Sequence, residues 1–358
     1  MDFALSPDQR QMQASISGTL DRVSPLARVR AFAVGNEPIA RDVWAALADL
    51  GVAGLLAPEQ YGGLGLGLLN AALAAEALGA HAAPAPFLGS AVLAPLAIAA
   101  AGSAAQKEAW LPRLAAGEVT AGAVLHEALV GVRDAAGVGT ESGRLTGESH
   151  FAIDAPGADL LIVADRSGCL HLALAKDAQI DPMTTIDATR RFARVRFDNA
   201  PAEALANGEA LERLGDAAFA MLAADMLGAA QAMADKAVAY AKERRQFGRP
   251  IGAFQAVKHM CAEVAAELEP CRSLVWYAAY AFDAVPAEAP LVAAHAKAHL
   301  SEVSRFVART ATEVHGGIGF TDLLGLHYWF KRVGVDRQLF GGPEQVRERA
   351  ARLQRLVT

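Results

Sequence analysis

Apolar residues recur every three to four positions through the first 118 residues of the chain. This period predicts amphipathic helices, for example over residues 43–50 around Trp44. Ser6 and Asp8 belong to the residue types that commonly begin a helix, and they precede the first apolar repeat. We therefore expect a helical domain over residues 1–118.

Residues 82–106 form a long stretch without a charged side chain. Its length would allow a membrane span, but it consists mostly of Ala, Gly, Ser and Pro, with few large apolar residues. Pro84, Pro86 and Pro95 would interrupt a single helix. We interpret the stretch as a pair of buried helices, and we expect no membrane-spanning segment.

The pattern changes between residues 119 and 204, where short apolar runs alternate with Gly, Asp and Pro clusters. Such turn-forming clusters between short apolar runs are typical of a small antiparallel sheet. We predict a central β domain over residues 119–204. Its clearest strands are expected at residues 158–164, 170–175 and 194–197.

From residue 205 the helical period returns and continues to the end of the chain. Long helical segments joined by short turns indicate an antiparallel four-helix bundle over residues 205–358. The predicted fold class is α+β and mostly α, with helical domains at both ends and a small sheet between them. The four bundle helices are expected at residues 205–244, 250–283, 287–315 and 335–356.

Composition narrows the classes of function. The chain has 358 residues, of which 53% are hydrophobic, and its net charge is −6. An acidic chain argues against nucleic-acid binding, which favours a basic face. Three cysteines without metal-ligand or Cys-x-x-Cys spacing suit a reduced, cytoplasmic protein, and the N-terminal residues show no signal-peptide pattern.

Two glycine-containing segments carry the clearest candidate chemistry. Residues 240–255 (YAKERRQFGRPIGAFQ) place Arg and Gln beside a sharp turn, and residues 313–320 (EVHGGIGF) lead from a helix into a glycine cluster. Backbone N–H groups and a guanidinium in such places bind pyrophosphate. Neither segment is a Walker or Rossmann loop, because neither follows a strand and opens a helix. The same residues also suit a solvated helix end and a helix C-cap.

These two segments resemble the FAD-binding segments of the acyl-CoA dehydrogenase family. The resemblance covers nearly the whole chain and implies a helical domain, a β domain and a helix bundle. It also implies FAD bound at a subunit interface and α,β-dehydrogenation of an acyl-CoA thioester. Five further motifs match in the family's order: MDFALSPDQ, DVWAALADLGVAGLLAPEQYGGLGLG, EALG, WLPRLAAG and IDATRRFARVRF.

Carried over by motif, the resemblance assigns FAD contacts to both segments. Arg244 resembles the family's phosphate-contacting arginine, and the glycines allow the backbone to approach the adenosine end. Glu313 stands where the family usually has glutamine, and its carboxylate would repel the pyrophosphate unless it is protonated or turned away. The expected FAD contacts are Arg244, Gln246, Phe247, Phe254, Gln255, Glu313, Gly316, Gly317 and Gly319.

The expected flavin-ring loop departs from the family pattern, which is Thr-Glu followed by Gly-Ser-Asp. This chain has LHEALVGVRD at residues 125–134. In one interpretation His126 replaces a flavin contact, and in the other it is an ordinary hydrogen-bonded histidine.

The family reaction needs a carboxylate base beside the substrate α-carbon, in a dry pocket that raises its proton affinity. The two positions that the family uses correspond to Gly341 and Ala218, so the resemblance implies that both are vacant here. Phe219 also replaces an arginine that usually follows the second position.

Asp216 and Glu344 are candidate substitutes for the base. Asp216 lies two residues before Ala218, about 200° around a helix, and should point away from the base position unless the helix starts late. Each candidate also suits a helix cap, Asp216 after Gly215 and Glu344 after Pro343.

Three functions remain open. The first is an FAD-dependent acyl-CoA dehydrogenase that works as one subunit of a heteromeric complex, as in family members that degrade steroid side chains. The second is a catalytically silent structural subunit that completes the partner's FAD site. The third is a self-sufficient homo-oligomer with Asp216 or Glu344 as base. Small residues at Gly215, Ala218 and Gly341 would suit either a bulky acyl group or a subunit that no longer handles substrate.

The resemblance also implies partners. These are the acyl-CoA substrate, an electron-transferring flavoprotein as electron acceptor, and a homologous subunit in a tetramer built as a dimer of dimers. We expect no metal site. His295 and His299 share a helix face, but no glutamate follows His295 and no third ligand is evident.

Overall fold

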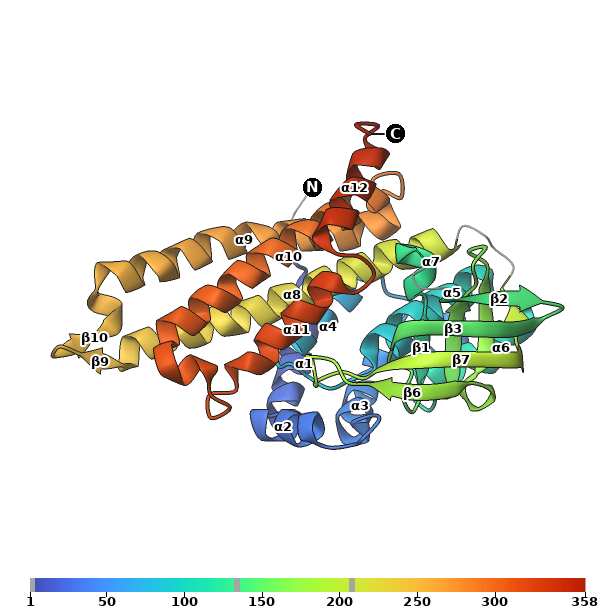
Figure 1. Cartoon of the computed structure of the whole chain (residues 1–358), viewed down its shortest axis with the longest axis horizontal. Helices are drawn as coiled ribbons and strands as arrows, with labels where there is room; N and C mark the ends of the chain where they lie inside the picture. The colour runs from blue at the N-terminus through green and yellow to red at the C-terminus, as the bar shows by residue number, and fades with distance from the viewer. Residues whose placement is uncertain (1–3, 132–135, 206–209, 358) are drawn as a thin grey trace.

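The computed structural model describes residues 4–131, 136–205 and 210–357 (Figure 1). Helices form the N-terminal part of the chain, as predicted. Ser6 caps the first of them by accepting a hydrogen bond from the Gln9 N–H, which confirms the predicted start. The helices are α1 (Pro7–Val23), α2 (Leu26–Val34), α3 (Arg41–Asp49), α4 (Leu68–Ala80), α5 (Ala94–Ala101) and α6 (Ala104–Ala115).

The charge-free stretch is buried, as expected. A π-helical turn at Leu88–Leu93 continues directly into α5, and α6 starts a few residues later. Among the residues that the structure describes, one helix is long and apolar enough to cross a membrane, α8 (Ala210–Glu243), and 89% of its most apolar window is buried inside the protein. That burial is the mark of a core helix.

The central sheet has strand order β6-β7-β3-β1-β4-β5-β8, with β2 on the outer part of β3. The prediction of an antiparallel sheet is wrong at one pair, because β1 and β4 run parallel, with Ala121 opposite Leu160. β4 is buried along its whole length, which is typical of a parallel central strand. The strands are β1 (Ala121–Val124), β2 (Gly137–Glu141), β3 (Arg144–Ile153), β4 (Leu160–Ala164), β5 (Leu170–Leu174), β6 (Gln179–Met183), β7 (Phe192–Pro201) and β8 (Glu203–Ala204).

The C-terminal part is helical, as predicted, but a break interrupts the last expected helix, residues 335–356, and most of the helix before the break was not predicted. Phe340 and Gly341 have φ angles of 56° and 112°, which an α-helix cannot contain. The break separates α11 from α12, so five helices stand where four were predicted. They are α8, α9 (Gln255–Ala284), α10 (Ala289–His315), α11 (Leu326–Gln338) and α12 (Pro343–Leu353). The division into domains at residues 118 and 204 stays a prediction.

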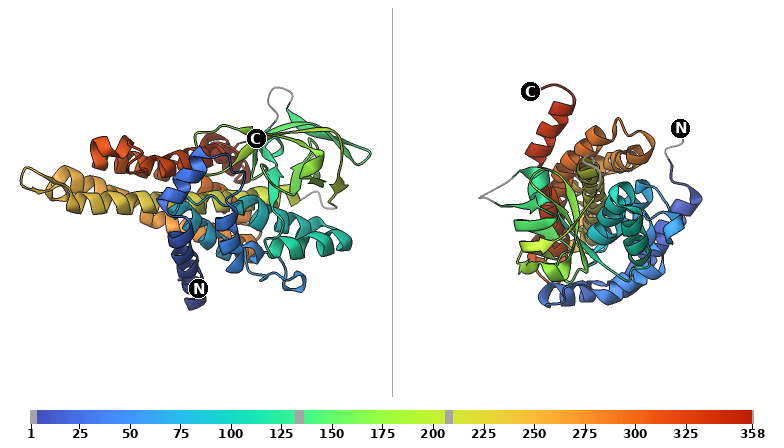
Figure 2. Two further views of the ribbon diagram at one scale, coloured as in Figure 1. Left: turned by 90° about the horizontal axis from the view of Figure 1, so that it is seen from below. Right: turned by 90° about the vertical axis from the view of Figure 1, so that its right-hand side faces the viewer.

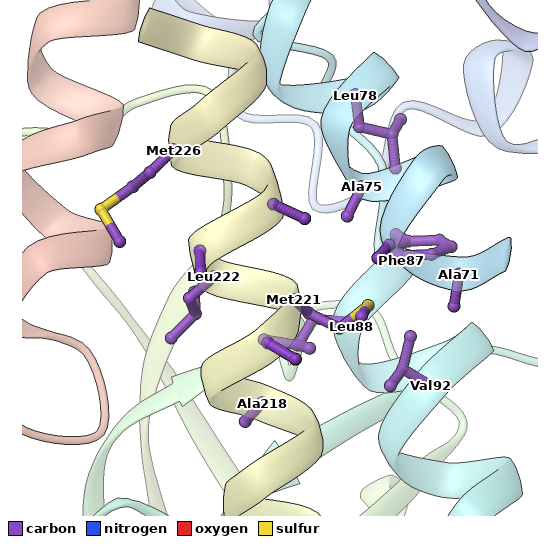
Figure 3. Close-up of a cluster of buried hydrophobic side chains, with 14 of the residues drawn as sticks. Ala71, Ala75, Leu78, Phe87, Leu88, Val92, Ala218, Met221, Leu222 and Met226 are labelled. Carbon is purple, nitrogen blue, oxygen red and sulfur yellow. The ribbon is translucent and has the colours of Figure 1, made fainter. Parts of the chain in front are cut away.

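Helix α8 is the centre of the molecule, between the sheet on one side and the N-terminal helices on the other (Figure 2). Met221 of α8 points toward Leu88 of the π-helical turn, and Leu78 of α4 lies on the same side of α8 (Figure 3). The two helix backbones approach closely. A Cβ atom at Gly228 would lie 1.8 Å from the Glu76 carbonyl oxygen, so only glycine fits there.

A buried ionic cluster joins the sheet to the C-terminal helices. Arg332 on α11 pairs with Asp225 on α8 at 2.6 Å, and Arg190 before β7 pairs with Asp336 on α11 at 2.6 Å. Asp154, at the end of β3, lies beside them and accepts a hydrogen bond of 2.9 Å from the Gly89 N–H. Burial raises the pKa of Asp154 to about 7.

Candidate functional site

The first predicted FAD segment forms a hairpin at the tip of the long helices (Figure 1). Strands β9 (Arg245–Gln246) and β10 (Arg249–Pro250) pair around a two-residue turn. Phe247 and Gly248 in that turn have φ angles of 50° and 78°, as a type I′ turn requires. A short 3₁₀ turn then leads into α9.

The side chains at this tip are open to solvent. Phe247 is 92% exposed, and its ring meets that of Phe254 edge-on at 6.1 Å. Arg244, Gln246 and Gln255 are exposed. The Arg244 guanidinium forms no ion pair with any carboxylate in the part of the chain that the structure describes, so its charge is available to an anionic ligand.

The second predicted segment lies at the same end of the bundle. Helix α10 ends at His315, whose ring stacks on that of Tyr240 near the end of α8 at 4.7 Å. No atom lies within 4 Å of where a Cβ would stand at Gly316 or Gly317, so a ligand has room to approach this backbone. Gly319 is different. Its Cβ would lie 2.7 Å from the Thr312 carbonyl oxygen, so this glycine serves internal packing.

Glu313, the residue expected to disturb cofactor binding, turns toward solvent. Its side chain is 56% exposed and lies 3.8 Å from the Arg309 guanidinium. Solvent and the neighbouring cation both weaken its repulsion of a pyrophosphate. The residues at the tip therefore fit the dinucleotide end of FAD.

The other predicted site residues lie at the opposite end of α8, beside the sheet. His126 begins the short helix α7 (His126–Val130), which the sequence analysis did not predict. Its ring lies 5.3 Å from that of Phe151 on β3 and 6.2 Å from that of Phe340. Much of the expected flavin-ring loop, where the family has Gly-Ser-Asp, corresponds to residues 132–135, which lie outside the described residues. His126 therefore belongs to an aromatic cluster next to the predicted base position.

Neither position predicted for the base, Gly341 or Ala218, carries an acidic side chain. Gly341 has a φ of 112°, and the nearest atoms to its absent Cβ belong to Gln345 and Val346 at 3.6 Å. Ala218 is fully buried within α8. Lys297 on α10 fixes the loop between α11 and α12. It donates hydrogen bonds to the carbonyl oxygens of Arg337 at 3.1 Å and Gly341 at 3.3 Å. The sequence did not indicate this role. Burial lowers the pKa of Lys297 to about 7.

Asp216 is not a helix cap, so that prediction is wrong. Helix α8 already includes Ala210, which places Asp216 well inside it, and its carboxylate pairs with Arg349 of α12 at 2.7 Å. Burial raises the pKa of Asp216 to about 6, and the Arg349 cation partly opposes this shift. Asp216 thus has the raised proton affinity of a base.

Arg349 fills the space that small residues were expected to leave open. A Cβ atom at Gly215 would lie 3.9 Å from the Nη1 atom of Arg349. It would lie 3.0 Å from a methyl carbon of Leu129. The guanidinium also lies 5.2 Å from the centre of the ring of Phe219, the residue predicted to replace a family arginine. The amphipathic pattern of α12 predicts a helix but gives no sign of this contact.

Glu344 faces solvent. Its side chain is 71% exposed and lies 3.6 Å from Arg337 and 3.7 Å from Arg347. It stands in the first turn of α12, where a negative charge is favourable. His295 and His299 are likewise exposed on α10.

The core between α4, the π-helical turn and α8 leaves little free space. A cavity there has a volume of about 20 Å³, and its lining includes Leu88, Met221, Leu222, Asp154 and Arg332. Such a volume holds a water molecule and not an acyl group.

Comparison with known proteins identifies the family. The model of the acyl-CoA dehydrogenase N-terminal domain matches residues 6–118, and that of the C-terminal domain matches residues 210–354. Acyl-CoA dehydrogenase IpdE2 of Mycobacterium tuberculosis is 32% identical over 345 residues, which cover 96% of each chain.

Two solved structures of heteromeric relatives share the fold over nearly the whole chain. The ChsE4–ChsE5 complex from Mycobacterium tuberculosis contains a chain with 26% identity and a TM-score of 0.92, and the match covers 100% of both chains. A Tcur3481–Tcur3483 steroid acyl-CoA dehydrogenase variant gives 30% identity and a TM-score of 0.88 over 98% of both chains. This chain belongs to the acyl-CoA dehydrogenase family, whose members are FAD-dependent oxidoreductases.

Proposed function

We propose that this chain is the non-catalytic subunit of a heteromeric acyl-CoA dehydrogenase. Its α8–α9 tip holds the dinucleotide end of an FAD molecule whose flavin ring lies in a homologous partner chain. The partner also carries the base and the acyl-CoA. When bound, FAD accepts a hydride from the β-carbon of the acyl group.

The main support for this proposal is the difference between the two ends of α8. Ala218 and the end of the helix at Glu243 are separated by 25 residues, or about 38 Å of helix. One FAD cannot contact both ends of the same chain. The tip has an open glycine backbone and an available guanidinium, whereas the end beside the sheet lacks a carboxylate at Gly341 and Ala218 and is packed with Arg349 and Leu129. A complete site therefore needs a second chain.

Heteromeric relatives support this assignment. Both solved relatives above carry two chain names, and one is a steroid acyl-CoA dehydrogenase. We infer a bulky or steroid-type acyl-CoA as the substrate of the complex, an electron-transferring flavoprotein as the acceptor, and a tetramer made of two such pairs.

The test compares the chain expressed alone with the chain co-expressed with the homologous product of a neighbouring gene. Alone, the chain should purify without visible flavin absorbance. Together, the two should purify as one complex that is bleached by an acyl-CoA. Arg244→Gln should remove flavin from the complex while both chains stay associated. A yellow, acyl-CoA-oxidising preparation of the chain alone would overturn the proposal.

One observation favours a second candidate, a self-sufficient enzyme. Asp216 is buried and has a raised pKa, as a general base in this family should. Its ion pair with Arg349 orients it toward α12. If the chain alone is active, Asp216→Asn should then lower kcat by at least about 100-fold, with Glu344→Gln as the matched control.

A further inference from the structure

An open cleft lies on the surface between the end of α2 and the segment before β7. Its volume is about 440 Å³, which is within the range of occupied binding sites. Apolar side chains form much of its wall, among them Val34, Pro38, Pro156 and Met183. The cleft is separate from the tip and from the aromatic cluster at His126.

Hydrogen bonds hold the cleft in its open shape. The Arg191 guanidinium donates to the carbonyl oxygens of Phe32 at 2.7 Å, Glu37 at 2.9 Å and Ala188 at 2.9 Å. It also lies 3.8 Å from the centre of the Phe32 ring. Because these bonds occupy the guanidinium, the cleft does not suit an anionic ligand. A rigid cleft with apolar walls suits an apolar side chain.

Exposed apolar side chains surround the cleft and extend beyond it. Val34 lines the cleft and is 84% exposed, and Ile186, which lies between the lining residues Thr185 and Asp187, is 62% exposed. Arg30 of α2 donates a hydrogen bond of 2.7 Å to the Leu323 carbonyl oxygen, which joins α2 to the loop before α11. Leu323 is itself 79% exposed and Phe320 is 77% exposed. We call the surface formed by these four apolar side chains and the cleft the α2 face.

The α2 face is continuous with the nucleotide-binding tip. Phe320 is the last residue of the 3₁₀ segment that starts at Gly316. In Figure 1 the loop before α11 and α2 lie next to each other at the lower edge of the molecule. Exposed apolar residues that continue from one contact area mark the extension of an interface.

We propose that the α2 face is a second contact area for the catalytic partner chain, with an apolar side chain of the partner seated in the cleft. This inference rests on the proposed function, because the partner that shares FAD at Gly316 must come within reach of Phe320. It separates the chain's two tasks, since the tip binds the nucleotide while the α2 face adds affinity between the chains.

The test measures the affinity of the purified chain for the co-expressed partner. Val34→Glu and Leu323→Glu each place a charge in the α2 face at a side chain that is more than three quarters exposed. Each should weaken binding at least about tenfold, because the charge would be buried without a counterion. Leu356→Glu is the matched control, since Leu356 is 72% exposed near the C terminus, on the opposite edge of Figure 1. It should bind as the wild type does.

The outcomes separate this inference from the proposed function. If a flavin-containing complex forms and both α2-face variants bind like the control, the inference is wrong and the proposed function stands. If the wild-type chain forms no complex and binds FAD alone, both are wrong. If the α2-face variants abolish only self-association, the face is occupied by a second copy of this chain, which contradicts the proposal.

Discussion

At the scale of single residues, the backbone conformation of Gly341 restricts this position to glycine, in addition to the absence of a carboxylate there. Its φ of 112° lies in a region that residues with a Cβ rarely adopt. Gly341→Glu should therefore lower the free energy of unfolding by about 1–3 kcal/mol and leave the isolated chain inactive. Urea unfolding and an acyl-CoA oxidation assay measure both effects.

Gly341→Ala is the control, because it carries the same backbone strain without a carboxylate. A glutamate variant that is as stable as the wild type, or that oxidises acyl-CoA, would contradict the account of this position.

Asp154 gives the protein a distinct pH dependence. Its pKa is about 7 when folded and near the ordinary value of 3.8 when unfolded, so the folded state binds more protons between these values. The stabilisation from protonated Asp154 is present at low pH and is lost as the pH rises from about 4 to 7. The shift corresponds to up to about 4 kcal/mol.

Asp154→Asn keeps an acceptor for the Gly89 N–H but cannot ionise. The difference in unfolding free energy between variant and wild type should therefore grow in the variant's favour from pH 4 to pH 7. Denaturant titrations at a series of pH values measure it, and parallel curves for the two proteins would refute the assignment.

At the scale of elements, the contact between α4 and α8 has no space for even one methyl group. Gly228→Ala should lower the free energy of unfolding by at least about 3 kcal/mol, because two helix backbones would have to separate. Gly18→Ala on α1 is the control. No atom lies within 4 Å of its Cβ position, so the substitution should be neutral or stabilising by up to about 1 kcal/mol. Thermal unfolding compares the two, and equal melting temperatures would exclude a tight contact.

Most elements could be predicted from local patterns, because period and capping are local signals. Ser6 marks the start of α1 correctly. The break after Gln338 was missed, because the φ angles at Phe340 and Gly341 depend on contacts such as that of Lys297 from α10. The parallel β1–β4 pair was missed because strand partners are set by the whole fold, and local turn signals give no information about them.

At the scale of the whole molecule, the buried ionic cluster is the joint between its parts. Arg332→Met leaves Asp225 buried without its cation and should lower the free energy of unfolding by about 3–5 kcal/mol. The double variant Arg332→Met with Asp225→Asn should recover part of that loss, because no unpaired charge remains. A double-mutant cycle by urea unfolding measures the coupling, and additive effects would show that the pair is not coupled.

The site was predictable only in part for the same reason. Motif matching named the tip residues, which lie within two short segments of sequence. The residues that close the other end come from separate elements, with Leu129 on α7 and Arg349 on α12 both beside Gly215. Side-chain contacts between distant segments leave no local pattern, so neither residue was proposed for the site.

The close packing of Glu76 against Gly228 also determines how the chain can fold during synthesis. Helix α4 ends at Ala80, and about 130 residues separate it from the start of α8 at Ala210. At typical translation rates of about 5–20 residues per second, this separation corresponds to a delay of roughly 7–26 s. A fragment that ends before α8 leaves the α8-facing side of α4 uncovered and should aggregate.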